Sequence, residues 1–286
     1  MRLIETNGVT LAVDDRGDGD PIVLLHGFPE LAYSWRHQVP ALVDAGYRVI
    51  SFDQRGYGQS AKPDDVEEYG LDKLVGDVVG LLDRLGIDRA TVVGHDWGSI
   101  VAWTCAVTHP DRFDRAVSLN VPYRGACVGF PTTDVLRSQL ADRFGYVLMF
   151  QDEGVAEQGF AANPEAWLMG FYAGGANGRT YMTNEELAVY VDAFTAGGIS
   201  GPINWYRNID RNAEAFGSYL DAPILQPTLM IAADNDPVLP LSLTDGMERW
   251  ITNLERVVIE DSGHWVQQEQ PDAVNQALIS WLDRTG

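Results

Sequence analysis

Short apolar strands alternate with amphipathic helices along this chain, and this alternation limits the possible fold more than any other feature of the sequence. Before residue 120, strand patterns fall at 22–25, 48–52, 90–93 and 115–119, and helical stripes fall at 35–43, 71–85 and 99–108. A hairpin with an Asn7-Gly8 turn precedes them. Strands that alternate with helices form a parallel sheet with helices on both faces. We therefore predict an α/β fold with a mostly parallel, twisted sheet.

The alternation stops in the middle of the chain. Residues 121–222 are rich in aromatic residues, glycine and asparagine, and they contain helical pieces such as 184–194 but no apolar strand pattern. Strand patterns return at 228–232 and 255–259, and a final helix carries Val274, Ala277, Leu278 and Trp281 at helical spacing. We predict one core domain, residues 1–120 and 223–286, interrupted by a helical cap at 121–222.

The charge of the chain excludes several classes of partner. Its 286 residues carry a net charge of -21, and it has two lysines, Lys62 and Lys73. Such a chain repels phosphate backbones and anionic bilayers, so we expect no nucleic acid and no membrane as a partner, whereas a homo-oligomer is compatible with this composition. The first residues lack the basic start and apolar stretch of a secretory signal, which favours a cytoplasmic protein. Cys105 and Cys127 are too few for a disulfide framework, and we expect both thiols to be free and buried.

A Gly-X-Asp-X-Gly element, Gly94 to Gly98 with Asp96 at its centre, joins a predicted strand to a predicted helix. In hydrolases such an element is the nucleophile elbow, a strained turn that presents the central side chain above the sheet. Asp96 would then be a carboxylate nucleophile, where the motif more often has serine. An aspartate before a helix is also a common N-cap, so the element alone leaves both interpretations open.

The segment His26-Gly27-Phe28-Pro29-Glu30 follows the strand pattern at 22–25. In hydrolases this loop supplies one backbone N–H of the oxyanion hole, and the residue after the nucleophile supplies the other. We therefore expect the N–H groups of Phe28 and Trp97 to form an oxyanion hole. Pro29 is a candidate for a cis peptide bond, and we expect His26 to be a hydrogen-bonded structural residue.

Two later loops offer the remaining members of a catalytic triad. Asp234 and Asp236 follow the strand pattern at 228–232, and either carboxylate could orient a histidine or serve only in a turn. One of the five histidines, His264, follows the last predicted strand, whereas the other four fall near surface helices or at positions with a structural explanation. His264 is thus the candidate base. The order nucleophile, acid, histidine is the order found in the α/β-hydrolase fold.

Five strings carry a resemblance to a known family. HGFPE, GHDWG and the GHW around His264, together with FGYVLMFQDEG and GPINWYRNI in the predicted cap, resemble the soluble epoxide hydrolases over essentially the whole chain. GHDWG alone is shared with haloalkane dehalogenases, but the two cap strings are more specific. Asp152 and Glu153 depart from the pattern, because the family more often has Glu then Pro there.

The resemblance implies an α/β-hydrolase fold and an enzyme that converts epoxides and water to vicinal diols through a covalent ester. It implies that Asp96 is the nucleophile and that Asp236 and His264 are its charge-relay partners. It also implies that two cap tyrosines, Tyr146 and Tyr206, grip the epoxide oxygen. No metal or organic cofactor is needed, and the apolar cap favours a small apolar epoxide as the substrate.

Three alternatives accompany this interpretation. A dehalogenase could use the same aspartate and base to displace a halide. A catalytically inactive hydrolase-fold protein could bind a ligand without turnover. An oxidoreductase is the third alternative, because the segment 56–61 matches the dinucleotide fingerprint G-x-G-x-x-A. Lys62-Pro63-Asp64-Asp65 follows this segment, however, where the fingerprint requires a helix.

Overall fold

The computed structural model describes residues 1–126, 131–172 and 181–286. Within these residues an eight-stranded sheet has the order β1-β2-β4-β3-β5-β6-β7-β8. β1 and β4 each pair with β2 in antiparallel fashion, and every other neighbouring pair is parallel. The strands are β1 (Arg2–Thr6), β2 (Val9–Arg16), β3 (Pro21–Leu25), β4 (Arg48–Asp53), β5 (Ala90–His95), β6 (Phe113–Leu119), β7 (Thr228–Ala233) and β8 (Leu254–Ile259). The mostly parallel sheet is therefore confirmed.

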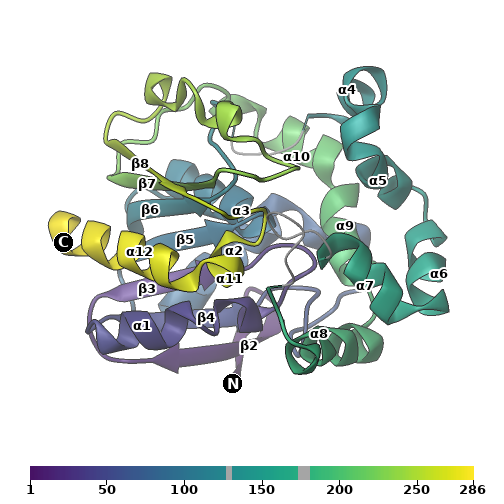
Figure 1. The fold of residues 1–286 in the computed structure, drawn as a ribbon, viewed down its shortest axis with the longest axis horizontal. Helices are drawn as coiled ribbons and strands as arrows, with labels where there is room; N and C mark the ends of the chain where they lie inside the picture. The colour runs from purple at the N-terminus through teal and green to yellow at the C-terminus, as the bar shows by residue number, and fades with distance from the viewer. Residues whose placement is uncertain (127–130, 173–180) are drawn as a thin grey trace.

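Helices cover both faces of this sheet, as predicted (Figure 1). α1 (Gln38–Asp44) and α12 (Pro271–Thr285) pack together on one face, and α2 (Leu71–Arg84) and α3 (Trp97–Thr108) pack on the other. In β3, Ile22 and Leu24 pack with α1 and α12, while Val23 and Leu25 pack in the hydrophobic cluster of α2 and α3, because successive strand residues face opposite sides. Burial on both faces explains why this strand is a continuous apolar run.

A group of helices joins β6 to β7 and lies at one side of the sheet (Figure 1). They are α4 (Thr133–Gln139), α5 (Ala141–Gln151), α6 (Val155–Ala162), α7 (Pro164–Tyr172), α8 (Asn184–Gly197), α9 (Ser200–Arg207) and α10 (Ile209–Ala215). The described residues between β6 and β7 contain no strand. We call these helices the cap, and we propose the core and cap boundaries at 120/121 and 222/223 as the domain division.

Two predicted helices begin elsewhere. The helix expected at 35–43 is a 3-10 turn, η1 (Ala32–Trp35), followed by α1 from Gln38. Proline lacks an N–H and is tolerated only in the first turn, so Pro40 requires a helix that starts just before it. α3 begins at Trp97, directly after Asp96, rather than near Ser99.

The remaining short elements join these layers. They are η2 (Val66–Tyr69), η4 (Gly217–Tyr219), η5 (Leu241–Thr244), η6 (Met247–Arg249) and α11 (Val266–Glu269). Cys105 is buried and free, as expected, whereas Cys127 lies outside the described residues. None of the helices in the described ranges has the length and apolarity needed to cross a bilayer.

Candidate active site

Four loops bring predicted site residues to one edge of the sheet. The loops follow β3, β5, β7 and β8, which are parallel, so their carboxyl ends lie at the same edge. They carry Phe28, Asp96, Asp236 and His264, respectively. Ligands of open α/β sheets bind outside the carboxyl ends of the strands. The topology thus places four of the predicted site residues where such a fold binds its ligands.

The turn at Asp96 has the strained backbone of a nucleophile elbow. Asp96 has φ 50° and ψ -122°, a conformation that costs a non-glycine residue about 1–3 kcal/mol. A Cβ on Gly98 would lie 2.0 Å from the carbonyl oxygen of Leu25, and a Cβ on Gly94 would lie 2.2 Å from that of Gly98. A Cβ on Gly27 would lie 2.4 Å from the Asp96 Cβ. The three glycines let β3, the elbow and α3 approach closely enough to hold Asp96 in this turn.

His264 lies between two carboxylates. Its Nδ1 is 2.8 Å from Asp236 Oδ2, and its Nε2 is 3.4 Å from Asp96 Oδ2. Asp236 is further fixed because its Oδ1 accepts the backbone N–H groups of Val238 at 2.7 Å and Leu239 at 2.9 Å. The sequence offered two carboxylates, Asp234 and Asp236, as the partner that orients His264. The structure distinguishes them, because Asp234 accepts backbone N–H groups in the loop after β8 and Asp236 contacts the imidazole.

Each charge in the group of Asp96, Asp236 and His264 stabilises the opposite charge beside it. Burial acts to lower the pKa of His264, but the two carboxylates outweigh it and hold this pKa well above 6.5. Burial acts to raise the pKa of Asp96, but its hydrogen bond to His264 and the imidazolium charge keep that pKa below 3.8. The same balance of burial against His264 keeps the pKa of Asp236 low. At neutral pH the resting site therefore holds two carboxylates and one imidazolium.

A backbone N–H from the loop after β3 contacts the Asp96 carboxylate. The Phe28 N–H donates to Asp96 Oδ1 at 2.8 Å, and the Phe28–Pro29 peptide bond is cis, as predicted. Trp97 is the first residue of α3, so its N–H lies at the positive end of that helix. Of the two predicted oxyanion donors, the Phe28 N–H thus contacts the Asp96 carboxylate, and the Trp97 N–H stays a predicted donor at the start of α3.

Two cap tyrosines face this site from different helices. Tyr146 of α5 and Tyr206 of α9 have ring centroids 6.1 Å apart, and both line a cavity of about 610 Å³ that also contains Asp96 and His264. Burial, together with the negative charge of Asp96, raises the pKa of both phenols above 10. Both tyrosines therefore stay protonated at neutral pH and can act as hydrogen-bond donors.

The loop that resembles a dinucleotide fingerprint supports α9 instead. The carbonyl oxygen of Arg55 accepts the indole N–H of Trp205 at 3.0 Å, and a Cβ on Gly201 would lie 2.8 Å from the Cα of Gly56. Arg55 itself is buried and paired with Asp77 at 2.6 Å. The loop thus holds α9 against the core and places Tyr206 above Asp96.

Sequence reasoning missed the importance of Glu30 and His95. Glu30 is fully buried, and its carboxylate accepts the Gly27 N–H at 2.8 Å and contacts His95 Nδ1 at 2.7 Å. The other ring nitrogen of His95 lies 2.7 Å from the carbonyl oxygen of His264. These contacts of Glu30 and His95 join the loops after β3, β5 and β8. In the sequence, the one indication of them was the charged residue Glu30 directly after the apolar residues Phe28 and Pro29. His26 is a hydrogen-bonded structural residue, as expected.

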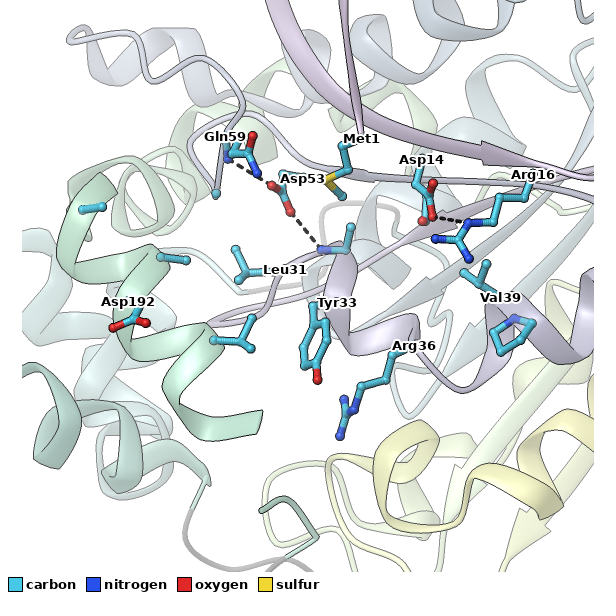
Figure 2. Close-up of a pocket in the computed structure, with 17 residues that line it drawn as sticks. Met1, Asp14, Arg16, Leu31, Tyr33, Arg36, Val39, Asp53, Gln59 and Asp192 are labelled. Atoms are coloured by element: carbon cyan, nitrogen blue, oxygen red, sulfur yellow. Dashed lines mark hydrogen bonds and ion pairs between the residues drawn. The ribbon is translucent and has the colours of Figure 1, made fainter. Parts of the chain in front are cut away.

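A second cavity of about 790 Å³ lies between α8 and η1 (Figure 2). Its lining includes Leu31, Tyr33, Val39, Asp53 and Asp192, which come from both core and cap. None of the residues predicted to act in catalysis lines it. The catalytic candidates therefore share the smaller cavity.

Comparisons with known proteins place this chain in a family. Residues 20–271 match the family described as alpha/beta hydrolase fold. Epoxide hydrolase A of Mycobacterium tuberculosis is 41% identical over 98% of this chain and 96% of that protein. The bifunctional epoxide hydrolase 2 of Rattus norvegicus is 38% identical over 96% of this chain, which spans 54% of that longer protein.

Solved structures agree with these relatives. The crystal structure of epoxide hydrolase A from Mycobacterium thermoresistibile superposes with a TM-score of 0.92 and 38% identity, covering 99% of this chain and 97% of that one. An epoxide hydrolase from an endophytic Streptomyces gives a TM-score of 0.93 and 36% identity, covering 99% and 94%. The resemblance seen in the motifs is confirmed. The chain belongs to the epoxide hydrolases of the α/β-hydrolase fold.

Proposed function

We propose that this protein hydrolyses epoxides to vicinal diols through a covalent alkyl ester on Asp96. The observation that carries the proposal is one cavity in which an ionised carboxylate, an imidazolium and two protonated phenols meet. Each group supplies one requirement of the reaction: a nucleophile, a base for the second step and proton donors for the ring oxygen.

In the first step a carboxylate oxygen of Asp96 attacks an epoxide carbon, and the C–O bond of the ring breaks. The departing oxygen becomes an alkoxide, whose conjugate acid is about as weak as water, with a pKa near 15.7. Tyr146 or Tyr206 donates a proton to it and forms an alcohol. A phenol suits this role because it remains protonated at neutral pH, unlike a carboxylic acid. The imidazolium of His264 then returns a proton to the tyrosinate.

In the second step His264 acts as a base. Once Asp96 is an ester it no longer carries the charge that helps to keep the imidazole protonated, so the pKa of His264 falls. The neutral imidazole removes a proton from water, which attacks the ester carbonyl carbon. The N–H groups of Phe28 and Trp97 would stabilise the tetrahedral oxyanion. The C–O bond between the ester carbon and the product then breaks, and the remaining proton of the attacking water passes to the departing alkoxide. The diol leaves, and the Asp96 carboxylate and the His264 imidazolium are restored.

The cavity walls favour apolar epoxides. Aromatic and aliphatic side chains form most of the lining, including Phe28, Trp167, Phe171 and Trp265. Such walls bind a substrate by burying apolar surface, while few polar groups orient it. A dehalogenase could share Asp96 and His264, but a halide leaves without a proton. The paired phenols would then have no function, so they favour epoxides over haloalkanes.

A comparison of turnover with an epoxide and with a haloalkane tests this proposal. We expect wild-type protein to convert styrene oxide to its diol and to release no chloride from 1-chlorobutane. Freshly prepared Asp96→Asn should lose at least about 10³-fold in rate, since it removes the nucleophile. Release of chloride would favour a dehalogenase, and absence of turnover with both substrates would favour the ligand-binding alternative.

A further inference from the structure

One cation in the cavity has no part in the reaction described above. Arg143 of α5 lines the cavity together with Asp96, Tyr146 and His264. The other side chains of the described lining, apart from the reacting groups, are apolar or aromatic. Arg143 is half-buried, and a partly desolvated charge is stabilised by a counter-charge or by a ligand that supplies one.

The structure gives Arg143 contacts but no counter-charge. One guanidinium nitrogen donates to the carbonyl oxygen of Val238, and the guanidinium carbon lies 5.2 Å from the centre of the Phe144 ring. Among the residues that the structure describes, Arg143 forms no ion pair. Three other arginines of the cap helices do have one: Arg137 pairs with Asp134, Arg207 with Glu157 and Arg211 with Asp72. Arg124, which precedes these helices, donates instead to the carbonyl oxygen of Leu243 at 3.1 Å.

The charge of Arg143 acts on Tyr146, one of the predicted catalytic residues of the cavity. Burial and Asp96 raise the pKa of Tyr146, and the positive charge of Arg143 opposes that rise. The triad itself holds two carboxylates and one imidazolium, so Arg143 brings the cavity and triad together to neutrality. An anionic group on a substrate would therefore meet a local cation even though the whole chain has a net charge of -21.

We propose that Arg143 is a specificity-determining residue that binds a carboxylate on the substrate, so that the preferred substrates are apolar epoxides bearing a carboxylate group. This inference rests on the proposed function. A guanidinium offers five N–H donors in a planar fork that matches a carboxylate, and the contact with Val238 leaves donors for a ligand. The apolar walls would hold the hydrocarbon part between Arg143 and Asp96.

The test compares two epoxides that differ in charge and little in shape. 4-(Oxiran-2-yl)benzoate carries the carboxylate, and 4-(oxiran-2-yl)benzamide is its neutral counterpart. We expect wild-type kcat/KM to be about 10-fold higher for the benzoate, with the difference mainly in KM. Arg143→Gln should remove this preference, so that the two epoxides have equal kcat/KM in that variant, whereas Arg143→Lys should keep part of it because it keeps the charge. Arg137→Gln, a cap arginine outside the cavity, should keep the wild-type preference.

Two results would overturn the inference. The first is an equal kcat/KM for both epoxides in the wild type. The second is an equal loss of kcat/KM for both epoxides in Arg143→Gln, since it would mean that Arg143 acts only through its contact with Val238. Turnover of the benzamide reports on the proposed function independently. Binding of the two corresponding diols, measured by calorimetry, gives the same comparison without turnover, and equal affinity there would also contradict the inference.

Discussion

The protonation of His264 separates the two halves of the proposed reaction. The resting imidazole is held as a cation by Asp236 and Asp96, and this cation in turn keeps both carboxylates ionised. Ring opening needs the ionised carboxylate, whereas ester hydrolysis needs the neutral imidazole. Because the ester removes one of the two negative charges, the first half of the reaction prepares the base for the second.

This coupling predicts a change in one titration. In wild-type protein, His264 should stay protonated above pH 6.5, since its folded pKa is raised. In freshly prepared Asp96→Asn the neutral amide imitates the loss of charge in the ester, so the pKa of His264 should fall below the wild-type value. NMR titration of the imidazole protons measures both. His37, whose pKa is lowered by burial and by Arg36, should not change. An unchanged pKa for His264 would show that Asp96 does not hold its proton.

The two phenols should share the work of protonating the alkoxide. We expect Tyr146→Phe and Tyr206→Phe each to slow ring opening by about 10²- to 10⁴-fold, and the double variant to be nearly inactive. Single-turnover measurement of epoxide loss isolates this step. If the double variant retained most of the wild-type rate, neither phenol would be the proton donor.

Some of these residues could be found from the sequence and others could not. The positions of Asp96 and His264 after predicted strands indicated two members of a triad, because the carboxyl ends of parallel strands lie at one edge of the sheet. The choice between Asp234 and Asp236 needed coordinates or a resemblance, since two carboxylates two residues apart differ only in which loop group they reach. Tyr146 and Tyr206 came from the resemblance alone. Arg143 became visible only once the structure placed α5 beside the loop after β7.

Among the elements, β3, β5 and α3 meet at a closely packed junction. The carbonyl oxygens at the end of β3 lie so close to α3 that the position of Gly98 leaves no room for a Cβ. This contact fixes α3 relative to the loop of Phe28. It thereby sets the 2.8 Å hydrogen bond between the Phe28 N–H and Asp96.

A methyl group at Gly98 should therefore damage both stability and activity. Gly98→Ala places a Cβ 2.0 Å from the Leu25 carbonyl oxygen, and we expect it to cost about 1–3 kcal/mol of unfolding free energy and to reduce turnover about 10-fold or more. Gly145→Ala in α5 is the matched control. Its Cβ meets nothing within 4 Å, so it should be neutral or stabilise by up to about 1 kcal/mol. Urea unfolding and styrene oxide turnover measure both effects. Equal behaviour of the two variants would contradict close packing at the elbow.

Across the whole molecule, the reaction depends on how the cap sits on the core. Asp96, Asp236 and His264 belong to the loops of the sheet, while both phenols and Arg143 belong to cap helices. Several hydrogen bonds join the two parts, among them Trp205 to Arg55, Arg143 to Val238 and Arg36 to Glu186 at 2.7 Å. The alternation of strands and helices predicted the core, and the break in it predicted the helical insertion. Their relative placement depends on these long-range contacts, which no local pattern encodes.

The central claim is that Asp96 becomes an ester and that water attacks its carbonyl carbon. A single turnover of wild-type protein in heavy-oxygen water, with enzyme in excess over styrene oxide, tests this directly. We expect the diol from this first turnover to carry no heavy oxygen, because its new oxygen comes from the Asp96 carboxylate. Mass spectrometry of the peptide containing Asp96 should then show the heavy oxygen. A diol labelled in the first turnover, with an unlabelled Asp96 peptide, would mean that water attacks the epoxide directly and would contradict the covalent mechanism.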